Sequence, residues 1–339
     1  MTRTAQIVLL MGAAMSLAAQ PRTYELKPTP KTVVWGYFDA ASPPALKIRS
    51  GDSVTIETAM IGGPDMMAEG GIPESAIRET DRIIHREVKE KGAGPHILTG
   101  PVYVEGAESG DTLEVRIGPI KLAFRYALTL ICPGCGLLPD EFPYWRVKSV
   151  PLDPETMTAR FTDGVVVPLR PFFGCMGVAP PATTGRISTS PPWIHAGNMD
   201  NKDLVAGTTM YLPVHARGGL FSVGDAHAAQ GHGEVNVAAL ETALTGTFRF
   251  IVRKDLRLRW PRAETPTHYM TMAFHEDLDE AARIATREMI DFLVAEKHLS
   301  RDDAYMLCGT AVDLHVTQVV DGKKGIHAMV PKAVFTTGR

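Results

Sequence analysis

The sequence predicts a mainly β protein with an α+β layer towards its C-terminus. Glycine and proline are abundant, with 31 and 25 of 339 residues, as expected where many turns join many strands. Short apolar runs alternate with polar residues along most of the chain, which is the period of a half-buried strand. Residues 277–298 instead repeat apolar side chains with the roughly 3.6-residue period of a helix. The first pattern predicts sheets, and the change of period predicts the helical layer.

Composition and charge exclude several classes of function. Hydrophobic residues make up 45% of the chain, charged residues 22%, and the net charge is −3, as in ordinary globular proteins. A dedicated nucleic-acid binder would carry a basic excess, so we expect no nucleic-acid partner. After residue 20 no stretch of eighteen consecutive apolar residues occurs, so we expect no membrane association of the mature chain.

Residues 1–20, "MTRTAQIVLLMGAAMSLAAQ", have the three-part layout of a secretory signal. Arg3 precedes an apolar run from Ile7 to Met15, and small residues follow. The alternative is an N-terminal core helix. We predict a signal peptide over residues 1–20, cleaved near Ala19 to Pro21, and therefore an exported protein, periplasmic or secreted.

Residues 21–190 are predicted to form an N-terminal β-rich region with loop excursions. Residues 46–58, "LKIRSGDSVTIET", indicate two strands joined by a Ser-Gly-Asp turn. Residues 102–120 have the same strand–turn–strand pattern, with the turn in "ESGDTLEV". The echo suggests two similar β units. Residues 72–96 between them are polar with a short helical pattern, and we interpret them as an excursion over a sheet face.

Residues 191–339 are predicted to hold a central β signature and a C-terminal α+β region. Residues 209–228 and 233–254 resume the β pattern. The clearest helix covers residues 277–298, with acidic residues in its first turn. Residues 300–311 begin with a Ser-x-x-Asp cap signal and predict a second helix. Residues 312–322 and 325–335 predict a closing pair of strands.

Cys132 and Cys135 form a "CPGC" motif that export would allow to close a disulfide. Thioredoxin-like chemistry needs this motif at a helix N-terminus, but two prolines in the following "GLLPDEFP" argue against a helix. We therefore expect a turn, with or without a disulfide, and no catalytic role for either cysteine.

The stretch "GDAHAAQGHGE", Gly224 to Glu234, gathers two carboxylates and two imidazoles. If strands flank "AQGHG", this segment is a hairpin turn. Asp225 and His227 then point to one face, and Glu234 faces His227 from the opposite strand. Such a mixed set suits zinc or another borderline divalent ion. His232 falls at the turn tip, where we expect exposure to solvent rather than metal ligation.

Other polar residues could complete this site. The preceding loop, "HAGNMDNKDLVAG", contains His195, Asn198, Asp200 and Asp203, and His96 is the best distant candidate. Each residue alone has a structural alternative, as a backbone cap or a hydrogen-bonded core residue. The clustering of several such residues favours a metal or catalytic site.

Three extended segments carry a family resemblance: "HILTGPVYVEGAESGDTLEVRI", "GLLPDEFP" and the stretch from "GNMDNKDLVAGTTMYLP" to "GDAHAAQGHGEVNVAALET". In these the chain resembles the acetamidase/formamidase family over most of its mature length. The resemblance implies β-sandwich and barrel-like units, hydrolysis of short aliphatic amides to carboxylate and ammonia, and metal-dependent catalysis. The residues on the family's strong polar positions are Asn198, Asp200, Asp225, His227, Glu234 and Glu241. The chain departs from the family pattern at two places. It has "QGHGE", with His232, where the family often has "QGDGE", and it has "HAGNMD", with His195 and Ala196, where the family has "GGNMD".

These observations assign roles to the polar residues. The predicted ligands of a divalent metal, with zinc favoured, are Asp200, Asp225 and His227. The predicted proton carrier is Glu234 or Glu241, and the predicted substrate contacts are His96 and Asn198. A covalent route would need an activated Ser or Cys, but the sequence has no Gly-x-Ser-x-Gly elbow and assigns no base to Cys175.

The partners expected are therefore a small amide substrate and further copies of the chain in a homo-oligomer. The identity of the amide stays open. The alternative function is an exported, metal-stabilised β-sandwich binding module without catalysis.

Overall fold

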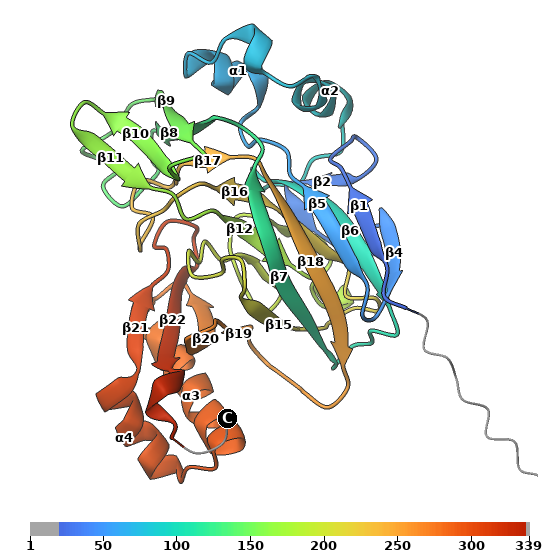
Figure 1. Ribbon diagram of the computed structural model, residues 1–339, viewed down its shortest axis with the longest axis vertical. Helices are drawn as coiled ribbons and strands as arrows, with labels where there is room; N and C mark the ends of the chain where they lie inside the picture. Colours follow the sequence, from blue (N-terminus) through green and yellow to red (C-terminus); the bar gives the residue numbers. More distant parts are fainter. Residues whose placement is uncertain (1–19, 337–339) are drawn as a thin grey trace, which may run out of the picture.

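The computed structural model describes residues 20–336, so the predicted signal peptide lies outside the described residues except for Gln20. Two large sheets dominate the molecule (Figure 1). The first has nine strands. In spatial order they are β1 (Thr23–Leu26), β5 (Ser53–Glu57), β18 (Leu244–Arg253), β7 (Thr112–Leu122), β15 (Thr209–Pro213), β19 (Arg262–Glu264), β20 (His268–His275), β22 (Lys324–Pro331) and β21 (Asp313–Val316).

The second sheet has eleven strands. Its main path runs through β11 (Val165–Pro168), β10 (Thr158–Thr162), β9 (Arg146–Asp153), β8 (Tyr126–Ile131), β17 (Glu241–Thr242), β16 (Phe221–His227), β12 (Phe172–Gly177) and β14 (Ala196–Asn198). Strand β6 (Ile97–Glu105) also pairs with β16, and β2 (Val33–Trp35) and β4 (Leu46–Arg49) pair with β6. A separate pair joins β3 (Tyr37–Phe38) to β13 (Ile187–Ser188).

The main hydrophobic core fills the space between these two sheets. Phe173 and Phe221 from the second sheet meet Phe248 and Phe250 of β18, with ring centroids 5.3 Å and 5.1 Å apart for Phe173–Phe248 and Phe221–Phe250. All four rings are fully buried, and aromatic burial of this size is a main source of folding free energy. The predicted mainly β class is confirmed.

The two Ser-Gly-Asp turns lie where the sequence predicts them, and each carries the chain from one sheet to the other. The first joins β4 to β5, and the second joins β6 to β7. β4 lies parallel to β6, whereas β5 and β7 flank β18 on either side. The turns are therefore corners of the sandwich, not hairpins within one sheet.

The helices lie at opposite ends of the molecule (Figure 1). The excursion between β5 and β6 contains α1 (Gly63–Glu69), the 3₁₀ turn Glu74–Ala76 and α2 (Glu79–Glu87). At the other end, α3 (Leu278–Lys297) and α4 (Arg301–Ala311) follow β20 and precede β21. Further 3₁₀ turns cover Ala182–Thr184 and Lys332–Val334. In the described part of the chain, no helix has the length and apolarity needed to cross a membrane.

The C-terminal α+β layer is confirmed with its predicted helix ends. The Asp277 side chain accepts a hydrogen bond from the Glu280 N–H at 3.0 Å, and Ser300 accepts one from the Asp303 N–H at 3.0 Å. These bonds satisfy amides that a helix N-terminus leaves free. α3 then packs its small apolar face on β20 and β22, where Ala273 and Ala328 are fully buried.

The predicted strand at residues 233–242 is wrong over most of its length, because only Glu241–Thr242 pair with β16. Residues 228–240 form a loop, which we call the 228–240 loop. Glu234 and Val237 have positive φ angles of 45° and 70°, and the Val237 N–H donates to the Glu234 carbonyl at 2.9 Å. A turn of this kind ends a strand. Val235, which the alternation would bury, is 55% exposed.

Candidate active site

A cavity of about 430 Å³ collects most of the polar residues that the sequence singles out. Its floor is polar and its walls are apolar. Loops and ends of β2, β8, β14, β16 and β17 contribute to it, and the α1–α2 excursion covers one side. The side chains that line it include Trp35, Met66, His96, Cys132, Cys135, Trp145, Asn198, Asp200, Asp225, His227, Glu234, Glu241 and Asp321.

His227 lies at the centre of the floor and is 1% exposed. Its Nε2 lies 3.2 Å from Glu241 Oε2 and 3.5 Å from Asp225 Oδ2. Two overlapping groups each bring three donor atoms within 4.8 Å of one another: one is Asp225, His227 and Glu241, and the other is Asp200, His227 and Glu234. The structure therefore brings together all five residues to which the sequence assigned metal-binding or proton-carrying roles.

The route by which Glu234 reaches His227 differs from the prediction. His227 pairs across the β16–β17 ladder with Glu241, not with Glu234. Glu234 arrives from the 228–240 loop, which is longer than the predicted five-residue turn. The expected face shared by Asp225 and His227 is present, and Glu241 occupies the opposite position that the shorter turn would have given to Glu234.

Gln230 fixes the orientation of the His227 ring. The Gln230 Nε2 donates to the carbonyl oxygen of Asp200 at 2.8 Å, so its Oε1 must be the atom that faces His227 Nδ1 at 2.9 Å. Nδ1–H therefore donates to Gln230, and Nε2 is the ring nitrogen that faces Asp225 and Glu241. An outer partner of this kind is typical of histidines that bind metals through the other ring nitrogen.

Gly174 in β12 lets the strand approach this cluster closely. A methyl group at this position would collide with Asp200 Oδ1 and would lie 2.7 Å from Asp225 Oδ2 and 2.8 Å from His227 Cε1. All three distances are shorter than ordinary van der Waals contact. The polar atoms therefore surround a space that only glycine leaves open.

Three acidic residues of the site have strained backbones. The φ angles of Asp200, Asp225 and Glu234 are 49°, 53° and 45°, in the left-handed region that residues with a side chain rarely adopt. Each such residue costs of order 1–3 kcal/mol, and such strain concentrates at functional sites. The fold thus maintains an unfavourable backbone at the positions that aim carboxylates into the cavity.

The carboxylates of the site differ in their affinity for protons. Burial opposes ionisation of Asp225, but His96 and His227 outweigh it and lower the pKa of Asp225 to about 2. Burial raises the pKa values of Asp200 and Glu234 well above the usual range, and neighbouring carboxylates add to the effect. Burial also raises the pKa of Asp321 to about 6. Carboxyl groups with pKa values pushed apart can act in different roles.

The predicted substrate contacts both line the cavity. His96 Nε2 lies 3.6 Å from Asp225 Oδ2, and its Nδ1 has no hydrogen-bond partner. Asn198 is 2% exposed, and its Oδ1 is also unpartnered.

Two other polar residues of the loop that contains Asn198 lie outside the cavity. His195 packs edge-on against Phe38 in the core, and Asp203 belongs to a separate histidine cluster.

Sequence reasoning missed Asp321, Gln230 and Gly174. Asp321 lies in the turn between β21 and β22, far along the chain from the recognised cluster, and no local spacing pointed to it. Gln230 lies within "GDAHAAQGHGE", but its role follows only from the path of the 228–240 loop. His232 is not a free turn tip, since its side chain is only 33% exposed and packs against His315 and His327.

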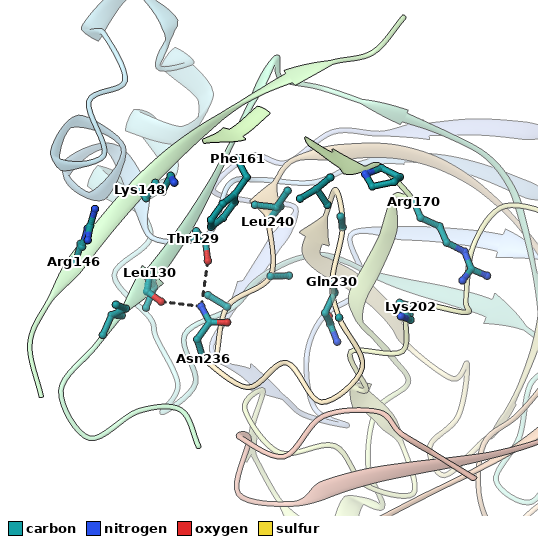
Figure 2. A pocket seen from close by; sticks show the side chains of 17 residues that line it. Thr129, Leu130, Arg146, Lys148, Phe161, Arg170, Lys202, Gln230, Asn236 and Leu240 are labelled. Atoms are coloured by element: carbon teal, nitrogen blue, oxygen red, sulfur yellow. Dashed lines mark hydrogen bonds between the residues drawn. The ribbon is translucent and has the colours of Figure 1, made fainter. Parts of the chain in front are cut away.

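A larger cavity of about 780 Å³ opens beside the 228–240 loop (Figure 2). Its apolar floor includes Phe161 and Leu240, and basic side chains surround it, among them Lys148 and Arg170. The lining that the structure describes contains neither a carboxylate nor a histidine. It therefore has no group to move a proton at neutral pH, and the smaller cavity is the better candidate for catalysis.

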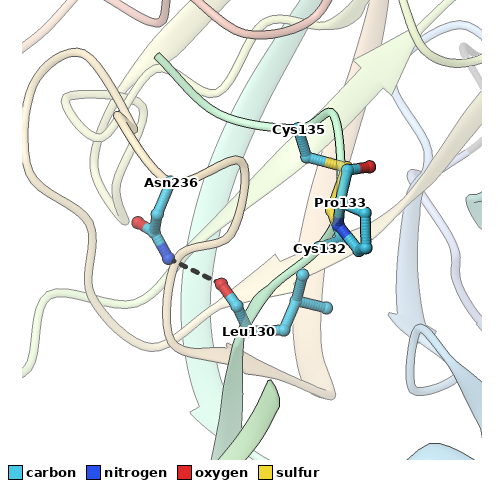
Figure 3. The surroundings of a disulfide bond; sticks show 5 residues. All are labelled: Leu130, Cys132, Pro133, Cys135 and Asn236. Carbon is cyan, nitrogen blue, oxygen red and sulfur yellow. Dashed lines mark hydrogen bonds between the residues drawn. A yellow bond between two sulfur atoms is a disulfide. The ribbon is translucent and has the colours of Figure 1, made fainter. Parts of the chain in front are cut away.

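The cysteines fit structural roles. Cys132 and Cys135 form a disulfide with Cα atoms 5.3 Å apart, and the turn lies beside the Asn236–Leu130 hydrogen bond (Figure 3). The predicted turn is confirmed, although the disulfide also lines the cavity. Cys175 is fully buried, and burial together with the Asp225 charge raises its thiol pKa well above normal. This environment disfavours a nucleophilic thiolate.

Comparison with known proteins now identifies the family. The model of the acetamidase/formamidase family matches residues 37–187 and 182–337. The chain belongs to the acetamidase/formamidase family. It is therefore an amide-hydrolysing enzyme.

Individual relatives agree with this assignment. A formamidase of Methylophilus methylotrophus is 29% identical, over 67% of this chain and 73% of the relative. The crystal structure of an acetamidase from Bacillus halodurans is 33% identical and covers 92% of this chain and 98% of its own, with a TM-score of 0.77. The structure of an acetamidase from Yersinia enterocolitica is 28% identical to this chain. It covers 95% of this chain and 96% of its own, with a TM-score of 0.80.

Proposed function

We propose that this enzyme hydrolyses short aliphatic amides, of the formamide or acetamide kind, to a carboxylate and ammonia at the cavity around His227. The observation that carries the proposal is the combination of an ion-binding set with two further carboxyl groups in one buried pocket. The names of the formamidase and acetamidase relatives support the substrate class.

The side chains fit a divalent metal. His227 Nε2 and Glu241 Oε2 are buried and have no hydrogen-bond partner, although they lie only 3.2 Å apart. Unpartnered buried polar atoms are costly, and ligation would satisfy them. We assign Asp225, His227 and Glu241 as the holders of the ion, because Gln230 occupies the other nitrogen of His227. A bound divalent ion supplies acidification of water and polarisation of a carbonyl group.

Glu234 and Asp200 are left to carry the proton. Burial raises the pKa of both groups, so each holds a proton more readily than an exposed carboxyl group does, and each faces the cavity. In the proposed reaction, the water oxygen forms a bond to the amide carbon and the water proton moves to Glu234. The carbon–nitrogen bond breaks as Glu234 returns the proton to nitrogen, which leaves as ammonia. The acyl product is the carboxylic acid, and it becomes the carboxylate when its proton passes to ammonia to give ammonium.

The remaining groups position the substrate. The unpartnered Oδ1 of Asn198 can accept an N–H from the amide, and His96 lies beside Asp225 at the edge of the same floor. Trp35, Met66 and Trp145 provide apolar wall for a short acyl chain. Such walls also exclude bulk water, which strengthens electrostatic interactions inside the pocket.

The alternative is a metal-stabilised β-sandwich module that binds a ligand without reaction. Such a site has its ligands closed around the ion and needs no additional proton carrier. Glu234 and Asp200 lie outside the assigned ion-binding set and face the same cavity, which favours hydrolysis.

The deciding experiment measures ammonia release from formamide, acetamide and propionamide, before and after treatment with a chelator. We expect release that falls by at least about 10²-fold after chelation and recovers on adding Zn²⁺ or another divalent ion. His227→Ala should be as slow as the chelated enzyme, while His268→Gln, on the distant strand β20, should match the wild type. Turnover that is unaffected by chelation and by His227→Ala would refute the proposed site. No ammonia from any amide would favour the binding module.

A further inference from the structure

A second group of metal-binding side chains lies outside the active-site cavity. It consists of Asp203, His232, His315 and His327, each offering one donor atom, and these four atoms lie within 4.8 Å of one another. We infer that this group, the Asp203 cluster, is a second metal site, of structural type, for a divalent transition metal such as zinc. It shares no residue with the groups around His227.

Asp203 Oδ2 is the common point of the cluster. It lies 3.1 Å from His327 Nε2, 3.9 Å from His232 Nε2 and 3.9 Å from His315 Nδ1. Donor atoms in a tetrahedral zinc site with bonds of 2.0–2.1 Å are about 3.3 Å apart, so only small side-chain shifts would be needed. The other oxygen, Oδ1, is held by Arg170 Nη1 at 2.8 Å, which fixes the carboxylate and leaves Oδ2 for an ion.

The ring nitrogens of two histidines have surroundings typical of metal ligands. His327 is fully buried, and its Nδ1 lies 2.7 Å from the Thr317 hydroxyl. With an ion at Nε2, Nδ1–H donates to this hydroxyl, as metal-ligating histidines usually do to an outer partner. His315 Nδ1 is buried without a hydrogen-bond partner, a cost that ligation would remove.

The donor set points to the class of ion and to its role. Three imidazoles and one carboxylate suit zinc and neighbouring first-row divalent ions, and four protein ligands are typical of a structural rather than a catalytic zinc site. His232 and His315 are 33% and 31% exposed, so an ion can reach the cluster from solvent. A structural site needs such an entry path.

The position of the cluster suggests what the ion stabilises. His315 lies on β21 and His327 on β22, whereas His232 belongs to the 228–240 loop. Two backbone hydrogen bonds already join these segments, from Gly233 N–H to the Thr317 carbonyl and from Val319 N–H to the Gly233 carbonyl, both at 3.1 Å. The ion would reinforce this junction, which holds the loop that carries Glu234.

The test counts ions. Three proteins are compared: the wild type, the double variant H232Q/H315Q and the control variant H268Q. Each is stripped of metal with a chelator, equilibrated with Zn²⁺ and freed of excess ion, and its zinc content is then measured by elemental analysis. We expect the double variant to hold one Zn²⁺ fewer per chain than the wild type, and H268Q to equal the wild type. Zn²⁺ should also raise the Tm of the wild type more than that of the double variant, while the stripped proteins melt alike.

The same comparison in a His227→Ala background separates this site from the active site. His227→Ala alone should keep one ion, and H227A/H232Q/H315Q should keep none. Folding is checked by circular dichroism, and His315→Gln alone serves if the double variant fails to fold. Equal Zn²⁺ content in folded wild type and folded variant, in either background, would overturn the inference, whatever the amidase assay shows.

Discussion

At the residue scale, the absence of a side chain at Gly174 matters as much as the side chains around it. A methyl group here would enter the space between Asp200, Asp225 and His227. We expect Gly174→Ala to lower kcat/KM by about 10²-fold, because displacements near 1 Å at a reacting centre have that effect. Ammonia release from acetamide measures the change. Gly118→Ala, on β7 and away from the cavity, is the matched control, and equal activity of both variants would show that the space is not used.

The two glutamates at His227 should respond differently to the same substitution. Glu241→Gln removes a proposed ion ligand, so bound metal and activity should both decrease. Glu234→Gln should keep the metal and lower kcat by about 10²–10⁴-fold, the usual contribution of a general acid–base group. Elemental analysis and steady-state kinetics on both variants test the assignment. Loss of metal only in Glu234→Gln would reverse the two roles.

How much of the site the sequence could predict depends on how local its geometry is. The convergence of Asp225 and His227 follows from strand spacing alone, because residues i and i+2 share a face. The residue that faces His227 across the ladder depends on the length of the following loop. The alternation in "EVNVAAL" predicted a strand there, and therefore a loop that is too short. Asp321 and the Asp203 cluster depend on where β21 and β22 meet the 228–240 loop, and no short-range pattern encodes that contact.

At the scale of elements, the disulfide turn is the clearest test of structural against catalytic roles. The turn supports the 228–240 loop, since the Leu137 N–H donates to the Val235 carbonyl at 2.8 Å and Asn236 bonds to Leu130. We expect Cys132→Ser with Cys135→Ser to leave kcat within a few-fold and to lower the free energy of unfolding by at most about 2 kcal/mol, as the closed loop is very short. Chemical denaturation and ammonia release measure both effects. A folded double variant that loses activity by orders of magnitude would contradict this role.

Helices and turns were more predictable than the 228–240 loop for a physical reason. Asp277 and Ser300 begin helices through contacts with residues three positions on, so their signal lies within one turn. The bounds of α3 and α4 accordingly match the sequence pattern. The 228–240 loop depends on distant backbone partners, including the Thr317 carbonyl, and local alternation could not reveal them.

At the scale of the whole molecule, the class of fold was predictable but the sheet order was not. Alternation and turn residues predict many strands, whereas the order depends on pairings between distant segments. β18 pairs with β5 and β7, which precede it by more than a hundred residues. Such pairings are selected by the fit of whole faces in the core, where Phe248 meets Phe173 and Phe221. The family resemblance supplied the sandwich architecture that periodicity alone could not.

The expected homo-oligomer has a candidate surface at the mouth of the cavity. Several large apolar side chains of the segment after the disulfide are about half exposed, and together with Val235 they surround a groove of about 370 Å³. Leu137, Leu138 and Phe142 line this groove, whereas Tyr144 and Trp145 follow in the chain and are about half exposed outside its lining. Contiguous apolar surface of this kind usually marks a contact with another protein, and Trp145 also lines the cavity around His227. A second copy of the chain on this surface would shield both the apolar groove and Trp145 from solvent.

We therefore predict that light scattering after gel filtration will give a mass of at least two chains for the wild type. Leu138→Glu with Phe142→Glu places two charges on the apolar surface and should release monomers, because an unpaired charge is costly to bury. Val166→Glu, at an even more exposed apolar position on β11, is the control and should keep the wild-type mass. Monomeric wild type would reject the oligomer. An oligomer unaffected by the double variant but dissociated by Val166→Glu would move the interface to the β9–β11 edge of the second sheet.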